Sequence, residues 1–274
     1  MVLATLIVVL LIAVTWHYFL TSFREGAPET TTSQSMQSPR ISNVEIAGYL
    51  YSDEELYMRL KISGEVDLRN RLNINGVYGW WFGRITVSLP DGSQGEIMDA
   101  ENHENFFTQF TYLPGSITVD VYLPWTWYEE HSLEGFYNVT VWLQGPYEKR
   151  VVLFEKSFNL KMMLKAFVTP TTWRSWEENV SITITNTGNV PLILRGVGME
   201  ASGTGTVIGW LYAPTIEERI IVVMPGETRK WTGTPTMASN FKEELSGKTI
   251  QVDFVLDIAG ASQRFAVTTS VNFP

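Results

Sequence analysis

The stretch "VSITITNTGNVPLILRGV", Val180–Val197, decides the fold class. Before Asn186 its residues alternate between apolar and small polar types, and the alternation resumes after Asn189. A period of two is that of a strand with one face on a core. The "NTGN" segment between the two halves contains Gly188, which we predict to adopt a positive φ in a tight turn. The stretch therefore predicts two strands joined by a turn.

The same alternation continues through the chain after Arg40. Segments such as "ELYMRLKISGEVDL" and "FYNVTVWLQGPYEKRVVLFEKSFNL" precede this stretch, and "KTIQVDFVLDIAG" and "QRFAVTTSVNF" follow it. Short strands spaced about 8–12 residues apart, with Gly and Pro turns, indicate β-sandwiches. A helical period is suggested only in "ASNFKEELSG", Ala238–Gly247. We predict a first β-sandwich at 41–162 and a second, immunoglobulin-like one at 163–274, unless "KSFNLKMMLKAFVTP" is one strand that crosses between them.

The N-terminal segment has a different character, because residues 1–23 contain no Asp, Glu, Lys or Arg. About 20 helical residues cover the ~30 Å hydrocarbon thickness of a bilayer. Trp16, Tyr18 and Phe19 cluster where an interfacial belt would lie, and His17 beside them can reach water. A cleaved signal peptide fits less well, because no basic n-region or A-x-A site is present. A buried core helix would be unusually long. We predict a hydrophobic, transmembrane-type helix over 1–25 and a Ser/Thr/Pro-rich linker over 26–40.

The overall composition excludes several classes of protein. The chain has 274 residues, a formal net charge of -9 and no cysteine. An acidic chain is a poor ligand for nucleic acid, which is bound by clustered Lys and Arg. Without cysteine there are no disulfides, zinc–thiolate sites, iron–sulfur clusters or cysteine nucleophiles.

No catalytic motif is present: the chain lacks G-x-S-x-G, H-E-x-x-H, a P-loop and a dinucleotide fingerprint. His131 follows Glu129 and Glu130 without a nucleophile motif. We therefore predict that the chain is not an enzyme and uses no cofactor. One short segment combines side chains that could bind a hard cation such as calcium, namely Asp99, Glu101, His103 and Glu104. Its spacing is not that of an EF-hand loop, and a solvated acidic loop is the favoured interpretation.

Two further features concern the surface. The segments "NGVYGWWFGR", Asn75–Arg84, and "LPWTWYEE", Leu123–Glu130, are rich in aromatics. Exposed together they would form a carbohydrate- or partner-binding platform, although core and inter-domain packing is the favoured interpretation. Asn138 and Asn179 lie in glycosylation sequons. Glycans there would require both sandwiches to be outside the cell, which the β-sandwich interpretation already favours.

The second half of the chain resembles a known class of domain. "VSITITNTGNVPLILRGV" together with "VMPGETRKWTG" resembles the "NTGN-x-P-L … PGE" pattern of immunoglobulin-like sandwiches in archaeal surface proteins, over about 110 residues. With "ATLIVVLLIAV", Ala4–Val14, the whole chain resembles archaeal type IV pilins and archaellins. It departs from them in its initial Met and its additional sandwich.

This resemblance implies that a prepilin peptidase removes a basic leader and that the hydrophobic helices bundle into a filament core. The assembly residues would then be Leu3, Leu6, Ile7, Leu10, Leu11 and Val14. We therefore predict a structural subunit of an extracellular filament whose partners are copies of itself. The alternative is a single-pass, membrane-anchored extracellular β-sandwich protein that contacts lipid and binds a partner or serves a membrane complex. A third possibility is an anchored, chaperone-like sandwich.

Overall fold

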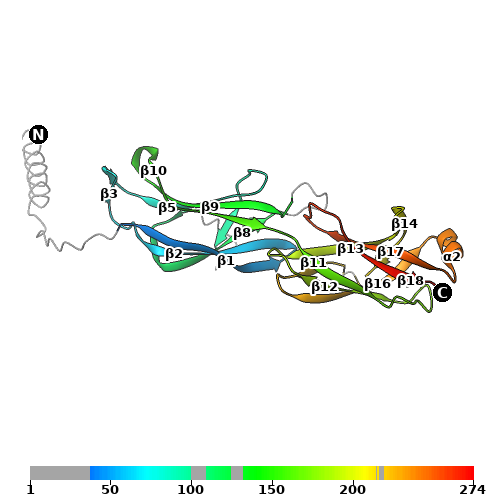
Figure 1. Cartoon of the computed structure of the whole chain (residues 1–274). Coiled ribbons are helices and arrows are strands. Elements are labelled where there is room, and N and C mark those ends of the chain that lie inside the picture. The colour runs from blue at the N-terminus through cyan, green and yellow to red at the C-terminus, as the bar shows by residue number, and fades with distance from the viewer. Residues whose placement is uncertain (1–37, 100–108, 125–131, 214, 216–218) are drawn as a thin grey trace, which may run out of the picture. The chain divides into compact units, whose positions relative to one another are not determined.

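The computed structural model describes residues 38–99, 109–124, 132–213, 215 and 219–274. Residues Pro39–Pro274 form one compact unit that contains two β lobes (Figure 1). The first lobe spans 40–160 and the second 164–274, and the predicted boundary at 162/163 falls between them.

The predicted fold class needs correction, because it included a hydrophobic, transmembrane-type helix. Among the described residues the α-helix is α2 (Ser239–Leu245), and none there is both long and apolar enough to cross a membrane. The fold is therefore mainly β. The residues for which the transmembrane-type helix was predicted, 1–25, lie outside the described part, together with the assembly residues and His17.

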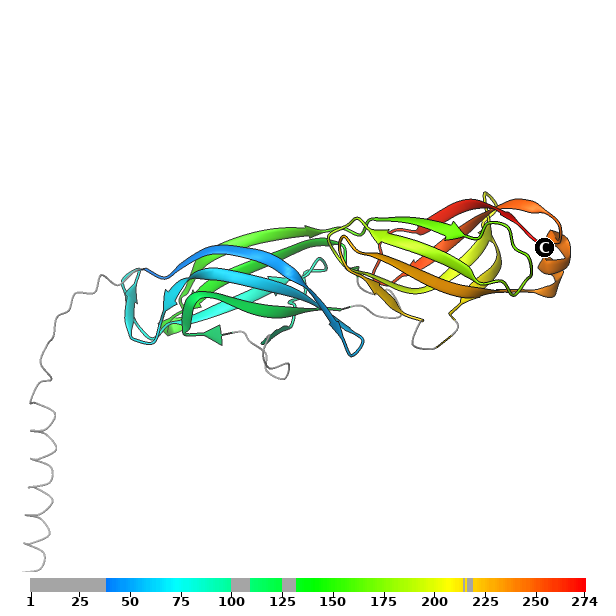
Figure 2. The ribbon, with the colours of Figure 1, turned by 90° about the horizontal axis from the view of Figure 1, so that it is seen from below.

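The first lobe consists of two four-stranded antiparallel sheets (Figures 1 and 2). One sheet has the order β1 (Arg40–Ser52), β2 (Glu55–Asp67), β8 (Tyr112–Leu123), β6 (Ile97–Asp99). The other has the order β10 (Arg150–Leu160), β9 (Gly135–Gln144), β5 (Phe82–Ser88), β7 (Gln109–Phe110). A hairpin of β3 (Leu72–Ile74) and β4 (Val77–Gly79) and the 3₁₀ turn η1 (Pro146–Glu148) complete it.

The alternation in the sequence explains this lobe. In β2 every second residue from Leu56 to Ile62 is fully buried, as are Val139, Val141 and Leu143 in β9. Period-two burial places these apolar rows on the inner faces of the sheets. The carboxylate of the buried Asp120 on β8 is paired with Arg59, with contacts of 2.9 and 3.1 Å. Asp120 lies between the inward-facing Val119 and Val121, so this ion pair is on the opposite face of the sheet from the apolar rows, where Arg59 neutralises the buried charge.

The second lobe differs from the predicted immunoglobulin-like sandwich of two separate sheets, because its strands form one sheet that nearly closes on itself. The order is β11 (Leu164–Thr169), β12 (Val180–Asn186), β16 (Thr228–Met237), β14 (Thr206–Tyr212), β13 (Leu192–Ala201), β17 (Thr249–Ile258), β18 (Phe265–Asn272), with β15 (Ile221–Val223) paired to β13.

Strand β16 makes this sheet continuous. Residues up to Gly233 pair with β12, and residues from Thr234 pair with β14. A Cβ on Gly233 would lie 2.5 Å from the ring of Trp231, so only glycine fits at the change of partner. The outer edges approach each other at Asn272, whose backbone N–H donates to Thr171 and whose carbonyl accepts from Trp173, both at 2.9 Å. Local alternation predicts strands, but it does not show which strand changes partners.

The "NTGN" turn is present, but for a different physical reason from the one predicted. Gly188 does not have a positive φ. Its Cβ position would lie 2.3 Å from the carbonyl oxygen of Lys161 and 2.7 Å from the backbone nitrogen of Met163. The glycine of the "PGE" turn, Gly226, has the positive φ, at 79°. The helical period at 238–247 is confirmed by α2.

Candidate functional site

The predicted cation ligands are not brought together in the described structure. Asp99 ends β6, and Glu101, His103, Glu104 and His131 lie outside the described residues. Within the described ranges no three His, Asp or Glu residues are grouped so that they could hold a metal ion.

Both sequon asparagines are exposed. The amide oxygen of Asn138 on β9 accepts a hydrogen bond from the Ser157 hydroxyl at 2.5 Å. That of Asn179, directly before β12, accepts from the Thr234 hydroxyl at 2.7 Å. Their glycosylation stays a prediction.

The aromatic segment at 75–84 divides between core and surface. Trp81 is 1% exposed, packs beside Gly145 and donates its indole N–H to the carbonyl of Leu72 at 3.3 Å. Trp80 is 50% exposed and Tyr78 is 65% exposed. The favoured packing interpretation therefore describes only part of the segment. Of the second segment, 123–130, only Leu123 and Pro124 are described.

The exposed aromatics of this segment belong to a larger surface at one end of the first lobe. Strand register places the end of β2 and the start of β8 at the same end as the start of β1, and both views show the β9–β10 turn at this end too (Figures 1 and 2). We call this surface the arginine–aromatic end; its exposed aromatic residues and the arginines near aromatic rings are Tyr78, Trp80, Tyr112, Tyr147, Arg69, Arg71 and Arg150.

Guanidinium groups face aromatic rings in this region. The Arg69 guanidinium lies 3.9 Å from the ring centre of Tyr112, and that of Arg71 lies 5.9 Å from Trp80. Arg150 lies 4.4 Å from the half-buried Trp142. These distances are in the cation–π range, so the arginines and rings hold each other in place. Tyr147, on η1, is 93% exposed.

The charge at the arginine–aromatic end is opposite to that of the chain as a whole. Exposed basic residues there are Arg40, Arg69, Arg71, Lys149 and Arg150, and exposed acidic residues are Glu65, Asp67 and Glu148. Asp67 is already paired with Arg69 at 2.7 Å. The side-chain hydrogen bond from Arg69, aided by its backbone N–H, lowers the pKa of Asp67 to about 2. This end of an acidic protein therefore has an excess of positive charge.

Sequence reasoning did not identify Tyr112, Tyr147 or the arginines of this surface. One signal was available for Tyr147, because it follows Gly145-Pro146 in a turn between two alternating segments. No local pattern connects residues 69, 112 and 147, which only strand pairing brings to one end.

A second notable region is the junction between the lobes, where Glu134 of the first lobe contacts loops of the second. Its carboxylate accepts hydrogen bonds from the backbone N–H groups of Met162 at 3.1 Å and Ser262 at 3.0 Å, and from the Ser262 hydroxyl. The backbone N–H of Leu133 donates to the carbonyl of Gly260 at 2.9 Å. The loops before β9 and after β17 are thereby joined.

Asn189 of the "NTGN" turn forms the other half of the junction. Its side chain accepts from the backbone N–H of Lys161 at 2.7 Å and donates to the carbonyl of Asn159 at 2.8 Å. Its own carbonyl accepts a hydrogen bond from the Tyr49 hydroxyl at 2.5 Å. Burial raises the pKa of Tyr49 above its ordinary value, so this donor keeps its proton. Side chains as well as the connecting segment at 161–163 therefore hold the two lobes together.

No family model matches the chain, and no curated protein sequence matches it. Among solved structures, a tetra-tandem repeat from the extending region of a large adhesion protein aligns with a TM-score of 0.32 and 12% identity, over 86% of this chain and 50% of that one. A protein of unknown function from Porphyromonas gingivalis W83 aligns with a TM-score of 0.28 and 12% identity, over 85% and 100%.

Red sea bream transglutaminase aligns with a TM-score of 0.30 and 13% identity, over 90% of this chain and 34% of the enzyme. This chain thus spans half of the adhesion-protein structure and about a third of the transglutaminase. Similarity at this level carries no argument about function.

Proposed function

We propose that this chain is a structural surface protein, held at a membrane by its uncharged N-terminal segment, whose two β lobes extend outside the cell. The arginine–aromatic end carries this proposal. Tyr and Trp are favoured at the level of lipid headgroups, and arginine binds phosphate groups through its planar fork of donors. The residues exposed at this end of the first lobe match that environment.

The position of this end along the chain supports the same proposal. Strand β1 begins at Arg40, at the arginine–aromatic end, and the uncharged segment ends at residue 23. The 16 residues between them span at most about 55 Å even when fully extended. A segment embedded in lipid would therefore keep the arginine–aromatic end within reach of the headgroups.

The junction supports a structural role. Hydrogen bonds of Glu134 and Asn189 connect the lobes at two separate places. Each such bond contributes on the order of 1 kcal/mol and limits hinge motion between the lobes. A rigid pair of lobes suits a spacer or a supporting subunit.

A filament subunit is the second candidate, favoured by the resemblance to archaeal pilins. In that arrangement the uncharged segment, with Leu6, Leu10 and Val14, packs against copies of itself instead of lipid. The two candidates differ in what surrounds this segment. Native protein released by shearing cells without detergent, and seen by negative-stain microscopy as ordered filaments, would favour the second candidate.

A labelling experiment tests the membrane proposal, using the absence of cysteine from the chain. Tyr147→Cys is labelled with a fluorophore in the full-length protein, which is then reconstituted into phosphatidylglycerol vesicles containing brominated lipid. Lys230→Cys, also exposed but in the second lobe, is the matched control. We expect strong quenching at position 147 and little at 230. Equal quenching at both positions, or none at 147, would refute the proposal.

A further inference from the structure

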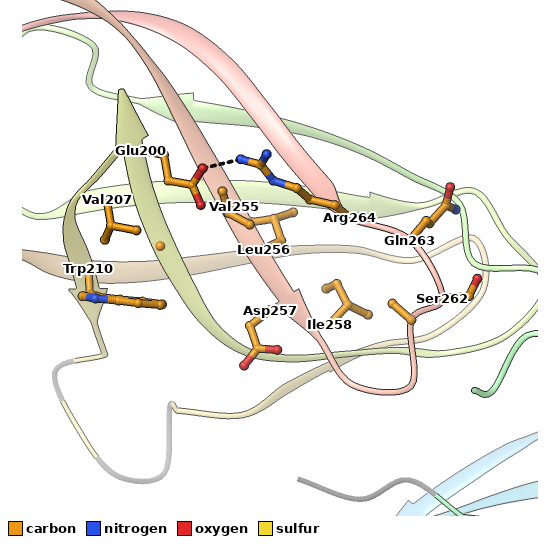
Figure 3. Close-up of a pocket in the computed structure, with 12 residues that line it drawn as sticks. Glu200, Val207, Trp210, Val255, Leu256, Asp257, Ile258, Ser262, Gln263 and Arg264 are labelled. Carbon is orange, nitrogen blue, oxygen red and sulfur yellow. Dashed lines mark hydrogen bonds and ion pairs between the residues drawn. The ribbon is translucent and has the colours of Figure 1, made fainter. Parts of the chain in front are cut away.

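The second lobe has an open cavity of about 440 Å³ on its outer surface (Figure 3). Residues of β13, β14, β17 and the β17–β18 turn line it, among them Gly198, Glu200, Trp210, Asp257, Gln263 and Arg264. A volume of this size is in the range of small-ligand pockets. None of its lining residues belongs to the arginine–aromatic end, and one of them, Ser262, also takes part in the junction through its hydrogen bonds to Glu134.

The wall of the cavity is an indole ring set against the backbone. Gly198 on β13 pairs with Trp210 on β14 and with Val255 on β17, so the three residues share one face of the sheet. A Cβ on Gly198 would lie 3.3–3.7 Å from the six-membered ring of Trp210. The missing side chain therefore leaves space that the indole partly covers. Trp210 remains 50% exposed, which leaves apolar ring surface open to a ligand.

Polar side chains line the cavity together with this ring. Glu200 and Arg264 form an ion pair at 2.7 Å, and Asp257 accepts from Arg195 at 2.6 Å. Figure 3 shows Glu200 on the same side as Val207 and Trp210 and joined to Arg264 by a dashed line, with Asp257 toward the middle and Gln263 and Ser262 on the side away from the ring. A carboxylate has about four acceptor sites, so each acid retains hydrogen-bonding capacity beyond its ion pair. The cavity thus combines one aromatic face with several donors and acceptors whose charges are largely balanced.

We infer that this cavity binds a carbohydrate. A pyranose ring has an apolar face of C–H bonds, which packs on an aromatic ring, and a perimeter of hydroxyl groups, which both donate and accept hydrogen bonds. The indole of Trp210 supplies the first contact, and Glu200, Asp257 and Arg264 supply the second. Because each carboxylate is already neutralised by an arginine, the site suits a neutral polyhydroxyl ligand better than a charged one.

The neighbouring surface extends the site toward an oligosaccharide. Tyr212 lies two residues after Trp210, on the same face of β14, and is 56% exposed. Two residues of a strand advance about 6.8 Å, which is comparable to the length of one sugar unit. Thr236 and Thr234 on β16 pair with Trp210 and Tyr212 and add hydroxyl groups beside them. A second sugar ring would therefore lie over Tyr212.

The test uses the full-length protein in a phosphocholine detergent, which has no sugar headgroup to compete. Methyl β-glucoside, methyl β-galactoside, cellotetraose and chitotetraose are each added at millimolar concentration. Saturation-transfer NMR then detects the sugar protons that contact the protein. We expect transfer to the ring C–H protons of at least one sugar, and stronger binding of a tetrasaccharide than of a monosaccharide.

Variants locate the binding. Trp210→Ala should abolish the transfer, and Asp257→Asn should weaken binding at least threefold. Trp80→Ala is the matched control, because Trp80 has the same exposed fraction in the first lobe. Circular dichroism establishes that each variant is folded. The inference is overturned if none of the four sugars shows transfer, if folded Trp210→Ala binds like the unmodified chain, or if Trp80→Ala loses binding equally. This result does not depend on whether the N-terminal segment contacts lipid.

Discussion

The carboxylate of Glu134 accepts a hydrogen bond from the backbone N–H of Ser262 at 3.0 Å, although 128 positions separate the two residues. The same carboxylate accepts from Met162, at the crossing between the lobes, at 3.1 Å. One side chain thus joins three loops and couples the stability of the two lobes.

Replacing Glu134 with alanine should weaken this coupling. The substitution removes the acceptor of two backbone N–H groups, and each unsatisfied donor costs about 1–3 kcal/mol where water does not replace it. Because Glu134 is half-buried, we expect a loss of about 2 kcal/mol in the free energy of unfolding, measured by urea denaturation of the full-length protein. Glu148→Ala, at the other end of the first lobe, serves as control. Unchanged stability in Glu134→Ala would show that the junction does not couple the lobes.

Gly188 and Gly226 should respond differently to substitution, because they are glycines for different reasons. At Gly226 the space is open and only the positive φ is restrictive. Asparagine tolerates that conformation better than alanine, so Gly226→Asn should cost less than Gly226→Ala, which we expect to cost about 1–2 kcal/mol. At Gly188 any Cβ meets the backbone of 161–163, so both substitutions should cost about 2 kcal/mol or more.

Thermal unfolding of the four variants measures this difference. The asparagine and alanine variants should differ in unfolding temperature at position 226 and have the same unfolding temperature at position 188. Rescue by asparagine at Gly188 would restore the positive-φ interpretation drawn from the sequence.

Alkaline pH should destabilise the protein partly through Tyr49. Burial raises the pKa of its phenol, so the folded state holds the proton when the unfolded state, with a pKa of about 10, has lost it. The contribution of Tyr49 to stability is therefore complete below pH 10 and falls above it, by about 1.4 kcal/mol per pH unit. Urea denaturation between pH 9 and 11 should show a shallower decline for Tyr49→Phe. The decline should not disappear, because burial also raises the pKa of Tyr57 and Tyr137.

The carboxyl group of Asp67 should titrate unusually low. Its pKa of about 2 follows from hydrogen bonds donated by Arg69. In Arg69→Gln we expect the midpoint, followed by carbon NMR, to rise toward the ordinary value of about 3.9. Because the pKa of Asp67 is lower in the folded state than in the unfolded state, its pairing with Arg69 stabilises the fold above pH 4. This stabilisation is lost as the pH falls toward 2. Arg229→Gln removes a similar pair, with Glu227, and should leave Asp67 unchanged.

Most strands could be predicted from residue alternation, and the reason is local. Side chains at every second position of β12 and β2 are buried, as the pattern of Ile182 and Ile184 requires. The same rule separates the adjacent Trp80 and Trp81, since neighbours in an extended chain point to opposite faces. Applied to "GWW", it would have indicated one exposed indole.

Residue alternation could not predict three other features, namely the closure of the second lobe, the junction and the cavity. The change of partners at Gly233 depends on the distance to Trp231, and the role of Glu134 depends on loops that are distant in the sequence. Trp210 resembles any strand tryptophan until Gly198 is seen beside it on the next strand. These features arise from pairing between segments, which a single sequence does not display.

The strand register has a mechanical consequence. In the first lobe the chain enters at Arg40 and leaves at Leu160, at the opposite end. In the second lobe the chain enters at Leu164, the start of β11. The last strand of this lobe ends at Asn272, which lies beside Thr172, just after the end of β11. Tension applied along the chain would slide β1 against β2 and β18 against β17. Antiparallel hydrogen bonds lie perpendicular to that direction, so the whole ladder resists the pull together and does not open one bond at a time.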